Sequence, residues 1–175
     1  MSKKLSPEKI VQQEDAVAKF KRLVADVNTC MFTTIDDNMQ LFSRPMATVH
    51  VDDEGNAWFF TNEFSEKVHE ISKDNNVYLI YSHPKHNIYV TVKGICMVVL
   101  DRGKMKEMWK PAMKAWIPDG IDDPKLCLLK VITEDAHFWN SAAQKMNVFF
   151  DRLKGREKLR KTNEGQLKLQ HAPVK

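Results

Sequence analysis

The chain has 175 residues, of which 43% are hydrophobic and 29% charged, and this balance suits one globular domain with an adequate core. The net charge of +4 is concentrated in residues 151–175, where eight basic residues against three acidic ones leave −1 for the rest of the chain. Nucleic acid is therefore not an expected partner of the core. No apolar run approaches the roughly 20 residues of a membrane-spanning helix, and no signal-peptide core follows Met1, so no membrane association is expected.

The cysteines and histidines favour structural roles. Cys30, Cys96 and Cys127 are an odd number of cysteines and each falls inside a predicted strand, so we expect buried, reduced thiols and a cytoplasmic location. His83 and His86 have a spacing found in metal sites, but they flank a proline turn and lack a matching Cys or His pair. A solvated turn is the preferred interpretation, and no metal site is predicted.

The predicted elements begin with a helix opened by Ser6 and Pro7, whose apolar residues recur at helical spacing up to Val27. Further helices are predicted at Glu66–Lys73, Lys104–Lys110 and Met146–Leu153. Strands are predicted at Cys30–Ile35, Leu41–Val51, Ala57–Thr61, Val77–Ser82, Asn87–Leu100 and Leu126–Ile132, the last extending toward Trp139. Six short strands, with the helices lying at the ends of and between the strand segments, indicate a mainly β fold. The expected architecture is a small antiparallel β-barrel with peripheral helices.

We expect one domain over residues 1–150, followed by a basic C-terminal extension over residues 151–175. The basic residues of this extension can touch nucleic acid or anionic lipid. The preferred interpretation is a solubilising segment that is partly helical or disordered.

A hairpin brings an arginine toward a strand-to-helix corner. Residues 52–56 are rich in Asp, Gly and Asn and predict a tight turn between two strands. If Val51 pairs with Ala57, antiparallel register places Arg44 opposite Phe64. Arg44 is then expected beside the corner where the second of these strands passes into the next helix.

That corner has the chemistry of a phosphate site without a glycine-rich loop. Ser65 is a good helix N-cap, and the first backbone N–H groups of the helix attract anions. Thr61 and Ser65 offer hydroxyl groups, Lys67 a point charge, and Arg44 a two-pronged one. The alternative, which spacing alone leaves open, is that Ser65 only caps the helix while both cations lie on a solvated face.

Other nucleotide and nucleophile motifs are absent from the sequence. Its six glycines form neither G-x-G-x-x-G nor a P-loop, and no G-x-S-x-G elbow occurs. The cysteines are too scattered for a C-x-x-C redox pair. Rossmann-type and Walker-type nucleotide binding are therefore not supported.

Several motifs in a fixed order resemble a known superfamily. They are Cys30–Thr34, Arg44-Pro45-Met46, Phe59–Asn62, Ser65-x-Lys67, Tyr89–Gly94, Met113–Gly120, Leu128–Val131 and Phe138-Trp139. Together they resemble the FMN-binding split-barrel superfamily, whose best-known member is pyridoxamine phosphate oxidase. The closer resemblance is to its general stress protein branch, over about Val17 to Trp139.

The resemblance implies a six-stranded antiparallel split barrel over residues 1–150 that binds FMN, with FAD as an alternative, at the interface of a homodimer. It assigns the flavin phosphate to Arg44, Thr61, Ser65 and Lys67. The remaining flavin contacts that it implies are Pro45, Met46, Ala47, Val49, Phe60, Tyr89, Trp116 and Trp139. For the last three, filling the core or the dimer interface stays open as the alternative.

Two departures from the oxidase pattern bear on activity. Glu66 stands where the oxidase has an arginine, which removes a phosphate-binding cation. The Arg-x-His pattern that follows the oxidase's late Trp is not reproduced after Trp139, so pyridoxamine phosphate oxidase activity itself is not expected. The sequence names no catalytic acid or base.

The resemblance favours a stress-related, flavin-dependent oxidoreductase of unknown substrate, with a nicotinamide nucleotide as a candidate electron donor. Two alternatives stay open. One is a non-catalytic flavin carrier or sensor. The other is a binding module that has lost flavin, with Glu66 as the first sign of that loss.

Overall fold

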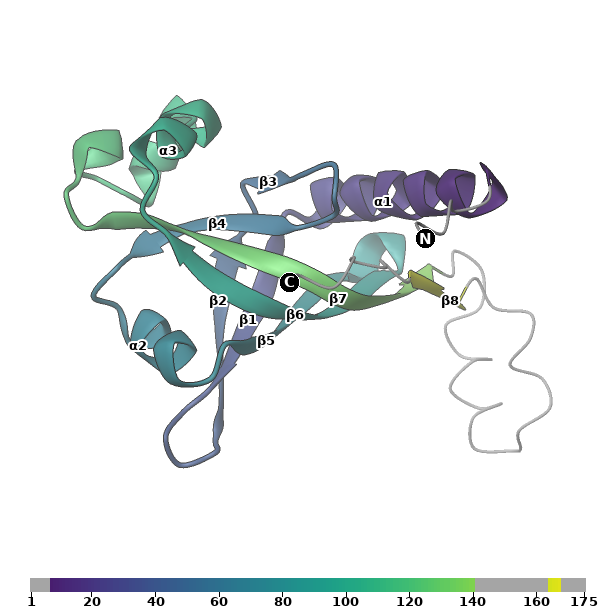
Figure 1. Ribbon diagram of the computed structural model, residues 1–175, viewed down its shortest axis with the longest axis horizontal. Coiled ribbons are helices and arrows are strands. Elements are labelled where there is room, and N and C mark those ends of the chain that lie inside the picture. The colour runs from purple at the N-terminus through teal and green to yellow at the C-terminus, as the bar shows by residue number, and fades with distance from the viewer. Residues whose placement is uncertain (1–6, 141–163, 168–175) are drawn as a thin grey trace, which may run out of the picture.

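The protein is a curled antiparallel sheet flanked by helices, and the computed structural model describes residues 7–140 and 164–167 (Figure 1). The helices are α1 (Pro7–Val27), α2 (Glu66–Lys73) and α3 (Arg102–Met108), with short 3₁₀ turns at Pro84–His86, Pro111–Ala115 and Gly120–Asp122. The strands are β1 (Thr29–Ile35), β2 (Leu41–Ala47), β3 (His50–Val51), β4 (Ala57–Asn62), β5 (Asn76–His83), β6 (Ile88–Val99), β7 (Leu126–Asn140) and β8 (Glu164–Leu167). The mainly β class and the split-barrel architecture are thus confirmed. The predicted number of six strands is wrong, because the described residues form a sheet of eight: the predicted strand Leu41–Val51 is two strands, and β8 adds to β7.

The sheet has the strand order β2-β1-β5-β6-β7-β4-β3, and β8 adds to β7. Its curl brings distant strands together, because the inward ring of Phe32 on β1 meets that of Phe59 on β4 edge to face, with centroids 5.2 Å apart. Both rings are fully buried. Phe20, Leu23 and Val24 of α1 join the same core, at the three- and four-residue spacing of a helix face. None of the helices in the described part of the chain has the length and apolar character that crossing a bilayer requires.

The predicted strand Leu41–Val51 is in fact two strands. Thr48 donates its backbone N–H to the Asn28 carbonyl (2.7 Å), and Val49 donates to the Trp58 carbonyl (2.9 Å). The chain therefore leaves β1 and joins β4 at this step, and β2 and β3 pair with different neighbours.

The predicted hairpin pair of Val51 with Ala57 is confirmed. The prediction that Arg44 lies opposite Phe64 is wrong, because the register of β3 does not continue into β2, and Arg44 pairs with Phe32 of β1 instead. Arg44 still reaches the corner before α2, because the curl of the sheet brings β2 to β4.

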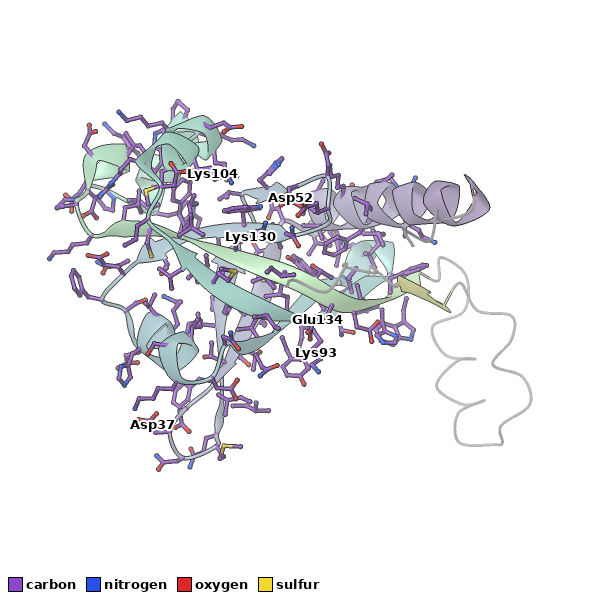
Figure 2. All side chains as sticks on the ribbon, viewed as in Figure 1. Asp37, Asp52, Lys93, Lys104, Lys130 and Glu134 are labelled. Carbon is purple, nitrogen blue, oxygen red and sulfur yellow. The ribbon has the colours of Figure 1, made fainter. Side chains whose placement is uncertain are left out.

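A second cluster fixes α3 to the outside of the sheet. Met105 of α3 is buried against Trp58, Cys127 and Leu128. The Trp58 indole N–H donates to Asp52 (3.0 Å), and the ammonium of Lys104 on α3 lies 5.0 Å from the Trp58 ring centroid. Figure 2 labels Asp52 and Lys104. Burial raises the pKa of Asp52, but hydrogen bonds from Trp58 and Asn56 outweigh this effect, so the pKa stays below its ordinary value.

Cys30, Cys96 and Cys127 are buried and free of disulfides, as predicted. Burial raises the pKa of Cys30 and Cys96 to about 12 and that of Cys127 to about 11, which disfavours the reactive thiolate. The predicted helix Met146–Leu153 lies outside the described residues. Within the predicted basic extension, Glu164–Leu167 forms β8, which the sequence did not predict.

Gly94 sits where β6 and β7 change register. The pairing shifts between Lys93 and Gly94. A Cβ atom at Gly94 would lie 2.5 Å from the Ile132 carbonyl oxygen and 2.8 Å from a methyl carbon of Val131. Only a residue without a side chain lets β7 approach β6 this closely.

We predict that Gly94→Ala lowers the free energy of unfolding by about 1–3 kcal/mol, because a buried methyl group must displace backbone. Urea denaturation measures this change. Lys93→Ala, at the adjacent exposed position, is the control and should change the value by no more than about 0.5 kcal/mol. Equal stability of Gly94→Ala and the unmodified protein would contradict the close approach.

Candidate functional site

A cleft of about 730 Å³ lies between β2, β4 and the loop that carries Trp116 and Ile117. Its walls include nine of the twelve residues that the sequence predicted as flavin contacts: Arg44, Pro45, Met46, Ala47, Val49, Phe60, Thr61, Lys67 and Trp116. Ser65, Tyr89 and Trp139 are not among its lining residues. Such a volume is typical of small-molecule sites, which range over about 300–1,000 Å³.

Lys67 points into the cleft from the first turn of α2. It is half-buried, and its ammonium donates a hydrogen bond to the Thr61 hydroxyl at the end of β4 (3.0 Å). Burial and the nearby positive charge of Arg44 lower the pKa of Lys67. Two cations held together in a partly desolvated corner form a place where an anion is stabilised.

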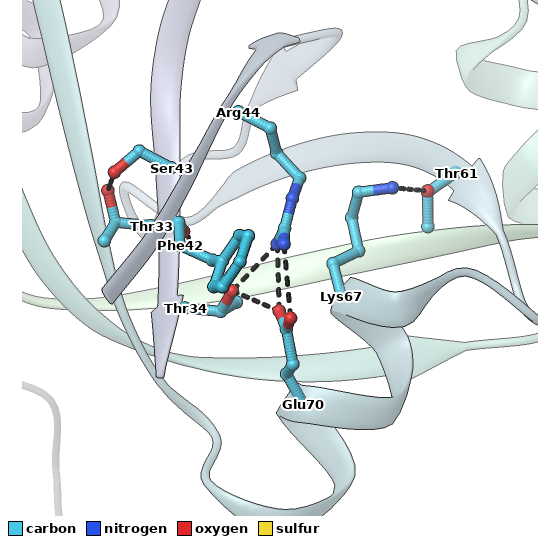
Figure 3. A network of polar contacts seen from close by, with 8 residues as sticks. All are labelled: Thr33, Thr34, Phe42, Ser43, Arg44, Thr61, Lys67 and Glu70. Carbon is cyan, nitrogen blue, oxygen red and sulfur yellow. Dashed lines mark hydrogen bonds and ion pairs between the residues drawn. The ribbon is translucent and has the colours of Figure 1, made fainter. Parts of the chain in front are cut away.

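A bidentate ion pair holds Arg44 in place (Figure 3). Its guanidinium donates to both oxygens of Glu70 on α2, at 3.0 Å and 3.2 Å, and to the Thr34 hydroxyl on β1, at 2.8 Å. Thr34 in turn donates to Glu70. One network therefore joins β1, β2 and α2.

Glu70 and Thr34 are buried, and neither was predicted from the sequence to belong to the site. Burial raises the pKa of Glu70, but hydrogen bonds from Arg44 and Thr34 outweigh it and keep the pKa below its ordinary value. The periodicity of the sequence could have indicated that both side chains face the site. Glu70 lies three residues after Lys67, and Thr34 alternates with the core residue Phe32 on the inner face of β1.

Ser65 occupies the N-cap position of α2, as predicted, with extended backbone angles of −75° and 151°. Its side chain makes no capping hydrogen bond. The Ser65 hydroxyl oxygen is buried and has no hydrogen-bond partner among the residues that the structure describes. A buried polar atom without a partner is costly and marks a position where a ligand atom can bind.

Tyr89 and Trp139 lie opposite each other on β6 and β7. Strand alternation places them on the outer sheet face. The register that aligns Met31, Ile80 and Thr91 across β1, β5 and β6 defines this face. The third predicted aromatic residue, Trp116, is 84% exposed at the rim of the cleft. The predicted aromatic set is therefore divided between the cleft and the outer face.

The predicted solvated turn at His83 and His86 is a 3₁₀ turn in which the two imidazole rings stack with centroids 4.1 Å apart. Among the described residues, no group of three His, Cys, Asp or Glu side chains is arranged to hold a metal ion.

The donor set of the cleft fits a flavin nucleotide. Arg44 and Lys67 supply cationic N–H donors at one end, and Thr61 supplies a hydroxyl group. Met46, Val49 and Phe60 add an apolar surface along the same cleft. A phosphate needs the first set of groups, and a flat, largely apolar ring needs the second.

A curled antiparallel sheet with such a cleft is consistent with a split barrel. Residues 15–163 match the family described as pyridoxamine 5′-phosphate oxidase like. The chain belongs to this family.

One curated protein is a distant relative of this chain. Protein bli-3 of Neurospora crassa is 27% identical over 118 residues, which cover 62% of this chain and 56% of that protein. This chain therefore spans little more than half the length of that relative.

Solved structures share the fold at low identity. A Clostridium acetobutylicum protein related to general stress protein 26 has a TM-score of 0.63 and 21% identity, covering 74% of this chain and 92% of its own. The general stress FMN/FAD binding protein of Xanthomonas citri has a TM-score of 0.64 and 23% identity, covering 75% and 93%.

We predict that Glu70→Gln lowers the free energy of unfolding at pH 7 by about 2 kcal/mol, because the charged hydrogen bonds to Arg44 are lost. A carboxylate whose folded pKa lies below its unfolded value stabilises the fold above that unfolded value, here 4.5. This stabilisation disappears as the pH falls through the folded pKa. The difference between the two proteins, measured by urea denaturation, should therefore shrink in acid.

Glu66→Gln, on the exposed side of the same helix, is the matched control and should keep the acid-dependent loss that Glu70 causes. A constant difference between Glu70→Gln and the unmodified protein from pH 7 to pH 3 would contradict the assignment of the ion pair.

Proposed function

We propose that the cleft binds a flavin nucleotide, FMN or FAD, and that the protein is a flavin-dependent oxidoreductase. The observation that carries the proposal is the convergence of Arg44 and Lys67 at one end of a cleft whose other lining residues suit a flat ring. Family membership and the FMN/FAD binding protein of Xanthomonas citri support it. When bound, the flavin would supply the electron-accepting chemistry, and the protein the binding and orientation.

The phosphate end of the flavin would lie at Lys67, Thr61 and Arg44. Glu70 and Thr34 accept hydrogen bonds from some of the N–H groups of the Arg44 guanidinium. The remaining N–H groups can donate to a phosphate. A dianion beside Lys67 would offset the cost of burying its ammonium next to a second cation. The isoalloxazine ring would then lie along β2, with Met46, Ala47 and Val49 beside it and Trp116 at the rim.

We propose further that two copies of the chain pair through the outer sheet face and complete the site. This face exposes Met31 (41%), Tyr78 (42%) and Ile80 (45%) side by side on β1 and β5. A contiguous apolar surface of this kind is typical of an interface. Tyr89 and Trp139 lie on the same face, so in a homodimer they would reach the flavin of the partner or the interface itself.

Replacing Lys67 with Ala should weaken flavin binding by about tenfold or more, because one charge-assisted contact to the phosphate is lost. Titration of flavin-free protein, followed by quenching of flavin fluorescence, measures the affinity. Lys106→Ala removes an exposed lysine outside the cleft and should bind flavin as the unmodified protein does. Equal affinity of Lys67→Ala and Lys106→Ala would refute the phosphate position.

Reduction of the bound flavin distinguishes an oxidoreductase from a non-catalytic flavin carrier. Loss of flavin absorbance on addition of NADPH or NADH, followed by reoxidation with a screened acceptor, is expected of an oxidoreductase. A bound flavin that no nicotinamide nucleotide reduces would instead favour the non-catalytic carrier.

Ile80→Lys should convert the dimer into monomers and weaken flavin binding, because it places a charge in the centre of the proposed interface. Sedimentation equilibrium measures the mass. Leu100→Lys is the matched control, since Leu100 is 61% exposed and follows β6 rather than lying on β1 or β5. An Ile80→Lys protein that remains dimeric would show that this face is not the interface.

A further inference from the structure

The cleft has a second wall, formed by the chain between α3 and β7, that the phosphate of the proposed flavin does not use. We call it the loop wall. It is lined by Met113, Trp116, Ile117, Pro118, Asp119 and Asp123. The opposite side, on β2 and α2, carries the cations Arg44 and Lys67. Both charged residues of the loop wall are acidic, so the two sides of the cleft have opposite charge.

Backbone contacts hold the loop wall in shape without a ligand. The N–H groups of Trp116 and Ile117 both donate to the Met113 carbonyl at 2.9 Å. The guanidinium of Arg102 on α3 donates to the Asp123 carbonyl, also at 2.9 Å. A ligand on this wall therefore meets groups that are already in place, which lowers the cost of ordering them on binding.

Trp116 presents an aromatic ring that the fold itself does not cover. It is 84% exposed, although it lines the cleft. Trp58 differs, since the ammonium groups of Lys104 and Lys130 lie 5.0 Å and 5.3 Å from its ring centroid. No cation of the described residues lies over the Trp116 ring. Because tryptophan is the aromatic side chain that attracts cations most strongly, this ring is open to a cationic ligand.

The carboxylate of Asp119 is the second open group of the loop wall. It makes no hydrogen bond or ion pair with any residue in the described part of the chain. The carboxylate of Asp123, by contrast, accepts the backbone N–H of Lys125 at 2.8 Å. An unpaired carboxylate on this side repels the phosphate of a flavin, which keeps that phosphate at the opposite side near Lys67, and it attracts a positive charge.

We propose that the loop wall binds a planar aromatic cation, which lies between the flavin and the Trp116 ring with its positive charge toward Asp119. This inference rests on the proposed flavin function and names the chemical class of the substrate. The flavin along β2 offers one flat surface and Trp116 the other. A neutral ring gains only the stacking, and an anionic ring is repelled by Asp119, so the wall selects ligands by charge.

The test titrates the flavin-loaded protein with three probes that share one ring system and differ in charge, by isothermal titration calorimetry at neutral pH. The probes are N-methylquinolinium, a cation, quinoline, which is uncharged, and quinoline carboxylate, an anion. The unmodified protein should bind N-methylquinolinium at least about fivefold more tightly than quinoline, and quinoline carboxylate should bind most weakly.

Three variants complete the design. Asp119→Asn should remove most of the preference for the cation and leave quinoline binding within about twofold of the unmodified protein. Trp116→Ala should weaken the binding of both N-methylquinolinium and quinoline, because the stacking surface is lost. Asp122→Asn is the matched control, since Asp122 is an exposed acidic residue of the same loop outside the cleft, and it should keep the full preference.

The outcomes separate this inference from the flavin proposal, because the absorbance of bound flavin is measured before each titration. Equal affinity of the unmodified protein for the cation and the neutral probe overturns the cation site while flavin binding stands. An equal loss of preference in Asp119→Asn and Asp122→Asn does the same. Loss of flavin from Trp116→Ala assigns that ring to the flavin and also overturns the site. An unmodified protein that takes up no flavin overturns both proposals.

Discussion

The bidentate ion pair between Arg44 and Glu70 is the interaction on which the arrangement of the site depends. It joins β2 to α2, and its contact with Thr34 adds β1. A guanidinium beside a second cation, Lys67, would be repelled from the corner without a carboxylate to hold it. Glu70 supplies that carboxylate from the inner face of a short helix, so the geometry exists before any ligand arrives.

The chain path explains why these elements meet. At Thr48 and Val49 the backbone passes from the edge beside β1 to the edge beside β4. The contact of Phe32 with Phe59 then closes the curl of the sheet. Because β2 precedes this crossing and α2 follows β4, their side chains face a common space. The cleft is thus a consequence of how the two halves of the barrel are connected.

Local signals in the sequence predicted much of this structure. The helix Glu66–Lys73 has the predicted bounds, and the strands are found close to their predicted positions, because alternation and turn residues act over a few residues. The motifs on β2 and β4 line one cleft. The split of the predicted strand Leu41–Val51 was not visible, since both pieces favour extended backbone and only tertiary pairing separates them.

The unpredicted part of the site consists of tertiary partners. Sequence spacing suggested that strand pairing would place Arg44 beside the start of α2. The structure instead holds Arg44 there by an ion pair with Glu70, 26 positions later in the chain. The capping role of Ser65 was equally plausible from sequence, yet its hydroxyl makes no cap bond. The resemblance assigned Tyr89 and Trp139 to the same flavin site as the cleft residues. They lie on the outer face instead, because strand alternation determines which face of a sheet a residue occupies.

The same ion pair limits how the site can attract an anion. Glu70 neutralises Arg44 and Glu66 adds a further negative charge, so the corner carries little excess positive charge despite its two cations. Long-range attraction is then weak, and recognition must depend on donors that are already oriented. The remaining N–H groups of Arg44, the ammonium of Lys67 and the Ser65 hydroxyl provide such donors on both sides of one ion pair. A ligand must therefore be recognised by how well its acceptor atoms match the positions of these donors, because the net charge of the corner attracts it only weakly.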